Sequence, residues 1–273
     1  MNGAFGRICR RLRVALRKGG GSVMADFALV LLLSGMTGCG GAASNSATPP
    51  DLDFAWIPPG IRPVGSWEAT RRSSPRSVSF QGFWLGRREV TTVEFAAYLL
   101  ATDLSPSPKI QDLIRWRGKW KARWFCGRYP VRGLSREEAE AYSSWLGSRH
   151  RRIGRLPSAD EWETAARGGI ESARYPWGWG NPHGRACFAA SGPSRTGRYP
   201  PNGYGLRDMA GNVFEWCSAG TNPVPAIACG GAWSEPDTRR LRVFERTEFA
   251  PEYRGQDVGF RVLLCVPPPS DEL

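Results

Sequence analysis

The sequence predicts an α+β domain in which short helices come first and short strands follow within irregular, turn-rich structure. Three helix starts can be identified before residue 170, and no long helical period survives after it. Gly (33), Pro (22) and Trp (12) are abundant, as is typical of a loop-rich fold with aromatic anchors and not of a helical bundle. The 273 residues, of which 41% are hydrophobic, suffice for a packed core.

Three helices are predicted from capping boxes, in which a Ser or Thr stands three residues before a Glu and the two side chains cap the first turn. The helices are expected to begin after Thr91, Ser135 and Ser158 and to end near Leu100, Leu146 and Gly168. Apolar side chains at helical spacing predict the buried faces, which are Phe95, Tyr98 and Leu99; Ala139, Tyr142 and Leu146; and Trp162, Ala165 and Ala166.

Strand candidates lie between the later turns, at residues 226–233, 241–246 and 258–265. Helices followed by strands favour a single α+β domain. We place this domain at residues 52–266, followed by a tail at residues 267–273.

The first 39 residues resemble a bacterial lipoprotein signal peptide. Basic residues precede a short apolar run, and small residues then lead to Cys39, which would be the lipidated residue. The apolar run is too short for a spanning helix, which needs about 20 residues. Residues 40–51 form a small-residue linker that would tether the domain to the lipid. We expect a bacterial cell-envelope protein, lipid-anchored after export; the alternative is an ordinary cleaved signal and a secreted or periplasmic protein.

The net charge is +12, and the scattered arginines indicate a solvated basic surface. One stretch, residues 115–124, interleaves Arg and Lys with tryptophan, a pattern that also suits stacking on single-stranded nucleic acid. Because an exported lipoprotein rarely meets nucleic acid, we predict that these aromatic side chains pack a long loop under the basic side-chain stems. No nucleic-acid partner is expected.

The most informative segment of the chain is Leu206–Trp216. It places the carboxylates of Asp208 and Glu215 on either side of a Gly-Asn turn and flanks them with large apolar groups. A short loop that supplies carboxylate and carbonyl oxygens can hold a hard cation such as calcium. The alternative is a turn in which Asn212 and Glu215 satisfy backbone N–H groups and bind nothing.

The segment Gly-Leu-Arg-Asp-Met-Ala-Gly-Asn-Val-Phe-Glu-Trp resembles the signature of the sulfatase-modifying-factor, or formylglycine-generating-enzyme, family. Other segments resemble further family elements in the family's order: residues 54–60, 83–95, 129–135, 155–169, 175–178, 229–233 and 258–261. The resemblance covers residues 52–266 and implies an FGE-sulfatase fold, C-type-lectin-like with much irregular structure. Activity is a separate question, because one fold supports many functions.

The resemblance implies an oxidase in which two cysteines bind copper(I), a soft metal that needs soft thiolate ligands. Counted from the Gly230-Gly231 pair, the two positions hold Glu235 and Arg240, and neither can ligate copper(I). We therefore predict no catalytic residue and no copper site. Another branch of the family uses histidine-ligated iron, which needs several histidines, and this chain has two.

The resemblance also implies a structural calcium site. Its ligands, carried over residue by residue, are the carboxylates of Asp208 and Glu215 and the main-chain carbonyls of Gly211 and Val213. With the resemblance included, we favour calcium at this loop over a turn that binds nothing.

Five cysteines remain after Cys9 and Cys39, which precede the domain. Exported domains commonly form disulfides. Cys217 with Cys229 is the candidate pair, because both flank strand-like segments near the signature.

Three functions stay open. A binding or scaffold module would recognise an envelope protein or a glycan through a polar face made of Ser234, Glu235, Asp237, Arg239 and Arg240. The alternatives are a formylglycine-type oxidase that modifies a sulfatase cysteine with displaced thiols, and a partner subunit of such an enzyme. The missing thiols favour the binding module.

Overall fold

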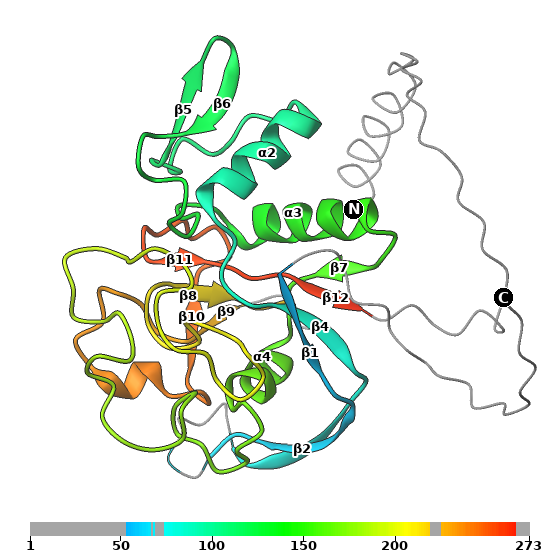
Figure 1. The fold of residues 1–273 in the computed structure, drawn as a ribbon, viewed down its shortest axis with the longest axis vertical. Helices are drawn as coiled ribbons and strands as arrows, with labels where there is room; N and C mark the ends of the chain where they lie inside the picture. Colours follow the sequence, from blue (N-terminus) through cyan, green and yellow to red (C-terminus); the bar gives the residue numbers. More distant parts are fainter. Residues whose placement is uncertain (1–52, 67, 69–73, 219–224, 266–273) are drawn as a thin grey trace, which may run out of the picture. The chain divides into compact units, whose positions relative to one another are not determined.

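The computed structural model describes residues 53–66, 68, 74–218 and 225–265 (Figure 1). The predicted signal, Cys39, the linker and the tail therefore lie outside the described residues. Two four-stranded sheets organise the described part. The first has the order β1 (Phe54–Ile57), β4 (Phe83–Gly86), β12 (Leu263–Cys265) and β7 (Gly154–Arg155); the second has the order β10 (Arg246–Phe249), β9 (Ala226–Cys229), β8 (Phe214–Trp216) and β11 (Val258–Gly259).

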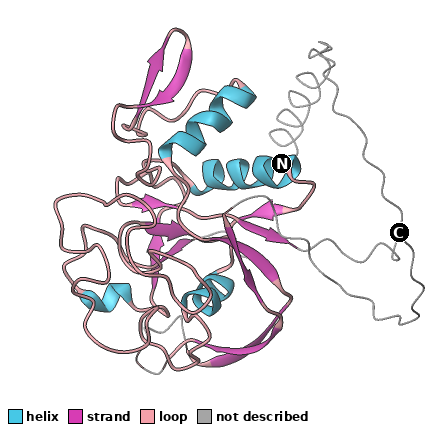
Figure 2. Ribbon diagram, viewed as in Figure 1, coloured by secondary structure: helices cyan, strands magenta, loops and turns pink. Residues whose placement is uncertain are grey.

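Strand pairing is antiparallel throughout the first sheet, and in the second only β8 and β11 are parallel. Two further antiparallel pairs form separate two-stranded sheets: β2 (Gly60–Val64) with β3 (Arg76–Phe80), and the hairpin of β5 (Leu113–Trp116) with β6 (Lys119–Ala122). Loops and turns connect the elements over long stretches, as Figure 2 shows. The predicted combination of α-helices, short strands and irregular structure is confirmed.

The three predicted helices are confirmed at their predicted starts. They are α2 (Thr92–Thr102), α3 (Arg136–Arg149) and α4 (Ala159–Ala166). Each begins with a complete capping box, in which the Glu carboxylate accepts the N-cap N–H at 2.7–2.8 Å. These two reciprocal bonds satisfy backbone donors that the first helical turn leaves without partners.

The core forms on two faces of the sheets because side chains alternate along each strand. Leu264 of β12 belongs to a cluster with α2 and α3, whereas its neighbour Leu263 belongs to a cluster around α4. In β9, Ala228 and Cys229 divide in the same way. Trp216 and Trp162, both fully buried, are the largest side chains of the two clusters.

Two predictions about the strands are wrong. Four strands precede α2, so the order of helices before strands does not hold. Residues 241–246 are not a strand: a short 3-10 helix, η2 (Thr238–Leu241), and a turn occupy this stretch, and the strand β10 begins at Arg246. Residues 258–265 divide into β11 and β12, which join different sheets.

The prediction that the aromatic residues of 115–124 pack a loop is also wrong in part. Trp120 is half-buried, but Trp116 is 56% exposed and Trp124 is 80% exposed. These residues belong to the β5–β6 hairpin and the turn after it (Figure 1). Among the described residues, no helix has the length and apolar character needed to cross a membrane.

Candidate functional site

The signature loop is built around Asn212, which is completely buried and bonds in four directions. Its side-chain oxygen accepts the N–H of Ser194 at 2.8 Å, and its side-chain amide donates to Glu89 Oε1 at 2.8 Å. Its own N–H donates to the carbonyl of Cys187, and its carbonyl accepts the N–H of Trp233, both at 2.8 Å. The alternative that the sequence left open, in which Asn212 and Glu215 satisfy backbone N–H groups, holds for Asn212 but not for Glu215, whose oxygens accept from side chains.

Gly211 allows this turn to approach its neighbour. Its φ is +74°, and a Cβ placed on it would lie 2.2 Å from the carbonyl oxygen of Cys187. A larger residue would therefore clash with backbone as well as adopt a disfavoured conformation.

Glu215 is the anionic centre of the loop and is 1% exposed. Arg261 donates to both of its oxygens, Nη2 to Oε1 at 2.5 Å and Nε to Oε2 at 2.6 Å. Trp162 donates its indole N–H to Oε2 at 2.6 Å. Burial opposes a charged Arg261, but the charge and hydrogen bonds of Glu215, together with the nearby acids Glu89 and Asp208, raise the pKa of the guanidinium. The result is a charge-assisted, bidentate pair inside the core.

Asp208, which has φ of 57°, aims its carboxylate at the backbone of a neighbouring loop. The oxygens accept the N–H groups of Gly197, Arg198 and Tyr199. Burial raises the pKa of Asp208 above its usual range although these three hydrogen bonds act in the opposite direction.

Glu89 is the third acid of this buried cluster, and no sequence argument singled it out. Its Oε1 accepts from Asn212, while Oε2 is buried without a hydrogen-bond partner. Burial, followed by the negative charges of Asp208 and Glu215, raises the pKa of Glu89 well above its usual range. Burial and the neighbouring acids therefore both favour the neutral form of this carboxyl group.

The polar face predicted at residues 234–240 is solvent-facing in part. Ser234, Arg239 and Arg240 are exposed, and Glu235 and Asp237 are half-buried. Asp237 caps η2 by accepting the Arg239 N–H at 3.0 Å, and it also pairs with the Arg239 side chain. Arg240 Nη1 donates to Thr247 at 3.1 Å, which fixes one side of the face.

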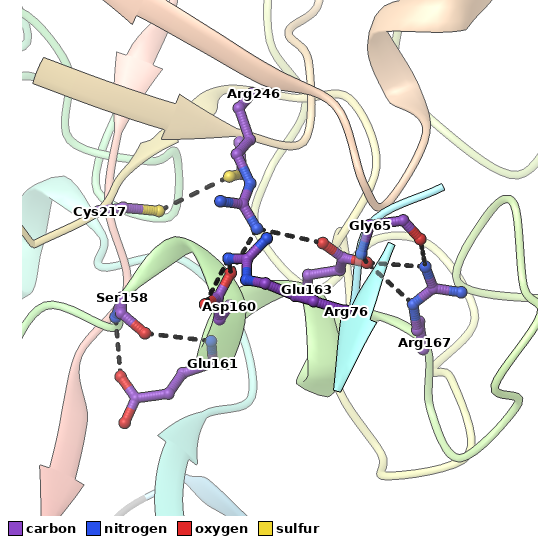
Figure 3. A network of polar contacts seen from close by, with 10 residues as sticks. Gly65, Arg76, Ser158, Asp160, Glu161, Glu163, Arg167, Cys217 and Arg246 are labelled. Carbon is purple, nitrogen blue, oxygen red and sulfur yellow. Dashed lines mark hydrogen bonds and ion pairs between the residues drawn. The ribbon is translucent and has the colours of Figure 1, made fainter. Parts of the chain in front are cut away.

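The candidate disulfide is not formed in the structure. Cys217 follows β8 directly and Cys229 is the last residue of β9. Both are free thiols, 0% and 1% exposed, and their sulfur atoms lie 3.7 Å apart. The hydrogen bond that the Cys217 thiol donates to the Cys229 sulfur, together with burial, raises the pKa of the Cys217 thiol well above its usual range. Arg246 lies close by and pairs with Asp160 and Glu163 (Figure 3).

The sequence model of the sulfatase-modifying factor enzyme 1-like domain family matches residues 41–265 of the chain. The chain belongs to this family. The matched region contains the signature loop, Arg261 and the positions Glu235 and Arg240, so the resemblance read from the motifs is confirmed.

Several family relatives are similar over much of the chain. The formylglycine-generating enzyme of Thermomonospora curvata is 30% identical over 257 residues, which cover 68% of this chain and 83% of the relative. The inactive C-alpha-formylglycine-generating enzyme 2 of Mus musculus is 33% identical over 165 residues, or 53% of this chain and 52% of the relative.

A third relative is named as a protein kinase and not as a formylglycine-generating enzyme. The serine/threonine-protein kinase pkn1 of Chlamydia pneumoniae is 36% identical over 162 residues, which cover 56% of this chain and 25% of the relative. This chain therefore spans about a quarter of the length of that kinase.

Two solved structures share the fold. PvdO from Pseudomonas aeruginosa has a TM-score of 0.64 and 25% identity, covering 77% of this chain and 93% of that chain. Treponema denticola variable protein 1 has a TM-score of 0.63 and 22% identity, covering 78% and 95%. The predicted α+β, FGE-sulfatase-type fold is confirmed.

Calcium at the signature loop stays a prediction. In this arrangement the Asp208 oxygens accept three N–H groups and the Glu215 oxygens are bonded to Arg261 and Trp162. Every oxygen of the two carboxylates already accepts a hydrogen bond, so an ion would compete with Arg261 and with the neighbouring loop for them. Within the described ranges, no three His, Cys, Asp or Glu side chains are grouped to hold a metal.

Sequence reasoning missed Glu89, Trp162 as a hydrogen-bond donor, and Arg261. All three lie in segments that carry the family resemblance, residues 83–95, 155–169 and 258–261. A charged residue within an otherwise apolar segment, as in Val-Gly-Phe-Arg, was the available signal, because buried charges need partners.

Proposed function

We propose that this family member is a binding module that does not oxidise cysteine. One observation carries the proposal: Glu235 and Arg240 stand where the resemblance implies the copper-binding cysteines. A carboxylate and a guanidinium cannot replace two thiolates around a soft metal. The similarity to an inactive C-alpha-formylglycine-generating enzyme 2 supports this direction.

The alternative function is a formylglycine-type oxidase whose copper-binding thiols lie at other positions of the chain. Cys217 and Cys229 are close enough to act as a pair, since their sulfur atoms are 3.7 Å apart. Both side chains are buried, however, and a raised thiol pKa opposes the thiolate that a copper ligand must supply. A peptide cysteine would also need a route to them. These features favour a structural role for the pair.

The binding face that we propose consists of Ser234, Glu235, Asp237, Arg239 and Arg240. Exposed guanidinium groups on a short 3-10 helix suit polar recognition of an envelope protein or a glycan. The chain would be held at the bacterial cell envelope through lipid on Cys39, with the linker as a tether.

Photo-crosslinking in the native envelope tests the proposed face. A photoreactive amino acid replaces Pro236, which is exposed on the face, and in a matched control it replaces Ile153, which is 65% exposed elsewhere. We expect a discrete adduct from position 236 that is absent from position 153. Adducts that are absent from both positions, or identical at both, would contradict binding through this face.

A further inference from the structure

An unpartnered apolar surface lies on α2 and the β5–β6 hairpin. The exposed residues within α2 are all apolar: Val93, Ala97, Leu100 and Ala101. Val93 and Leu100, seven positions apart and so on one helix face, are 53% and 55% exposed. A surface helix normally presents polar groups to water, and beside these apolar side chains α2 presents only the half-buried Glu94 and Thr102.

The turn after β6 extends this surface with two large aromatic side chains. Trp124 and Phe125 are 80% and 78% exposed. Their rings lie edge to face, with 5.6 Å between the ring centroids. Val93 adjoins the same turn, because its N–H donates to the carbonyl of Gly127 at 3.2 Å. Figure 1 shows α2 and the hairpin side by side.

The hairpin adds positive charge to the apolar groups. Residues 113–129 contain six basic side chains and no acidic one: Arg115, Arg117, Lys119, Lys121, Arg123 and Arg128. All six are exposed. A tight two-residue turn at Arg117 and Gly118, which both have positive φ, joins β5 to β6.

Strand register places Trp116 with the lysines. Trp116 is opposite Lys119, and Ile114 is opposite Lys121, so these four side chains share one face of the hairpin. Trp120 lies on the other face, where it lines a groove of about 460 Å³ together with Leu113. The first face is therefore the one that combines an exposed indole with two ammonium groups.

We propose that the exposed side chains of α2, of the turn after β6 and of the Trp116 face of the hairpin, together called the membrane patch, dock the protein onto an anionic phospholipid bilayer. The membrane patch consists of Val93, Leu100, Trp116, Lys119, Lys121, Trp124 and Phe125. Indole rings prefer the headgroup level of a bilayer, aliphatic side chains enter the acyl boundary, and lysines are attracted to anionic headgroups. Single-stranded nucleic acid would match the charge and the tryptophans, but it offers nothing to Val93 and Leu100.

The proposal goes beyond the function proposed above, because it requires neither the loss of oxidase activity nor lipid on Cys39. A lipid anchor alone would leave the domain free to rotate on its linker. Docking through the membrane patch would fix which face of the domain is turned to the bilayer.

Vesicle co-sedimentation of the full chain tests the membrane patch. The vesicles are phosphatidylglycerol mixed with phosphatidylcholine, or phosphatidylcholine alone. Two patch variants are compared, Lys119→Glu/Lys121→Glu and Trp124→Ser/Phe125→Ser. The matched control is Arg185→Glu/Arg195→Glu/Trp179→Ser, which makes the same change in net charge as the lysine variant and removes an exposed indole outside the patch.

We expect the wild type and the control to prefer anionic vesicles and to lose affinity with added salt. Each patch variant should bind anionic vesicles about tenfold more weakly or worse, because charge attraction and interfacial insertion act together. Circular dichroism should show unchanged folding. Equal binding by wild type and patch variants would overturn the proposal, as would vesicle binding that is indifferent to lipid charge.

Hydrogen exchange gives a local readout that separates the membrane patch from the first 39 residues. Anionic vesicles should protect residues 92–104 and 113–127 and leave residues 238–241 unchanged. Co-sedimentation without protection of the hairpin would overturn the proposal, because another segment would then hold the vesicle. A third outcome would also overturn the proposal: the wild type does not bind vesicles but binds a single-stranded oligonucleotide, and the patch variants lose that binding. The ligand would then be nucleic acid.

Discussion

Arg261 and Glu215, 46 residues apart in the chain, form a completely buried bidentate ion pair. The pair links the two sheets, because Glu215 belongs to β8 and Arg261 Nη1 also donates to the carbonyl of Gly86 at the end of β4 at 3.0 Å. Two segments of the family resemblance, the signature and Val-Gly-Phe-Arg, are thus one structural unit. Their presence supports the fold and says nothing of oxidation.

Removing one partner of this pair should be costly. Arg261→Met leaves a buried, uncompensated carboxylate, and we expect a loss of about 3–5 kcal/mol in the free energy of unfolding. Denaturant unfolding measures the change. The double variant Arg261→Met/Glu215→Met should be less destabilised than the sum of the single variants, because it removes both charges. Additive losses would mean that the two side chains do not act as a pair.

Glu89→Gln should make stability less dependent on pH. Because burial and neighbouring acids raise the pKa of Glu89, the folded chain holds its proton more tightly than the unfolded chain. The wild type therefore loses stability as pH rises from the usual range of a carboxyl group through the raised pKa. Gln keeps an acceptor for Asn212 and carries no such proton.

Melting temperatures of wild type and Glu89→Gln at about pH 4 and about pH 9 give the comparison. The advantage of the variant should be greater at the higher pH. A difference that does not change with pH would show that Glu89 is not held neutral in the folded protein.

Local features of this fold were predictable from the sequence, and long-range ones were not. Ser158 and Glu161 cap α4 through contacts three residues apart, so the capping box sufficed. The pairing of β12 with β4 joins residues 263 and 85, and no local pattern specifies it. For the same reason no local pattern in the signature predicts that Glu215 pairs with Arg261, which a distant segment supplies.

Cys217 and Cys229 should form a disulfide when the chain refolds in oxidised glutathione. The sulfur atoms are already in contact, and each thiol would give up its hydrogen to the glutathione couple. Peptide mapping identifies the bridge, and Cys217→Ser is the control that should abolish it. In the reduced, folded protein the same thiols should react slowly with a thiol reagent, because they are buried. A bridge between any other pair would contradict this expectation.

The calcium prediction has a test that allows for the bonds already made by its ligands. Asp208→Ala removes the acceptor for three backbone N–H groups and should destabilise the fold with or without calcium. If calcium binds there, it also raises the melting temperature of the wild type and a chelator reverses this, while Asp208→Ala shows no response. A wild type indifferent to chelation would rule out this site.

Whether the chain oxidises cysteine is decided by an assay for conversion of a peptide cysteine to formylglycine. The full chain is loaded with copper, aerated and incubated with a sulfatase-type cysteine peptide, and mass spectrometry follows the peptide. The enzyme of Thermomonospora curvata serves as the positive control. A second arm asks whether Glu235→Cys/Arg240→Cys gains copper(I) binding, as two added thiolates should provide. We predict that the wild-type chain leaves the peptide cysteine unchanged; its conversion to formylglycine would show that the protein oxidises cysteine and would make Cys217 and Cys229 the first candidate copper ligands to substitute.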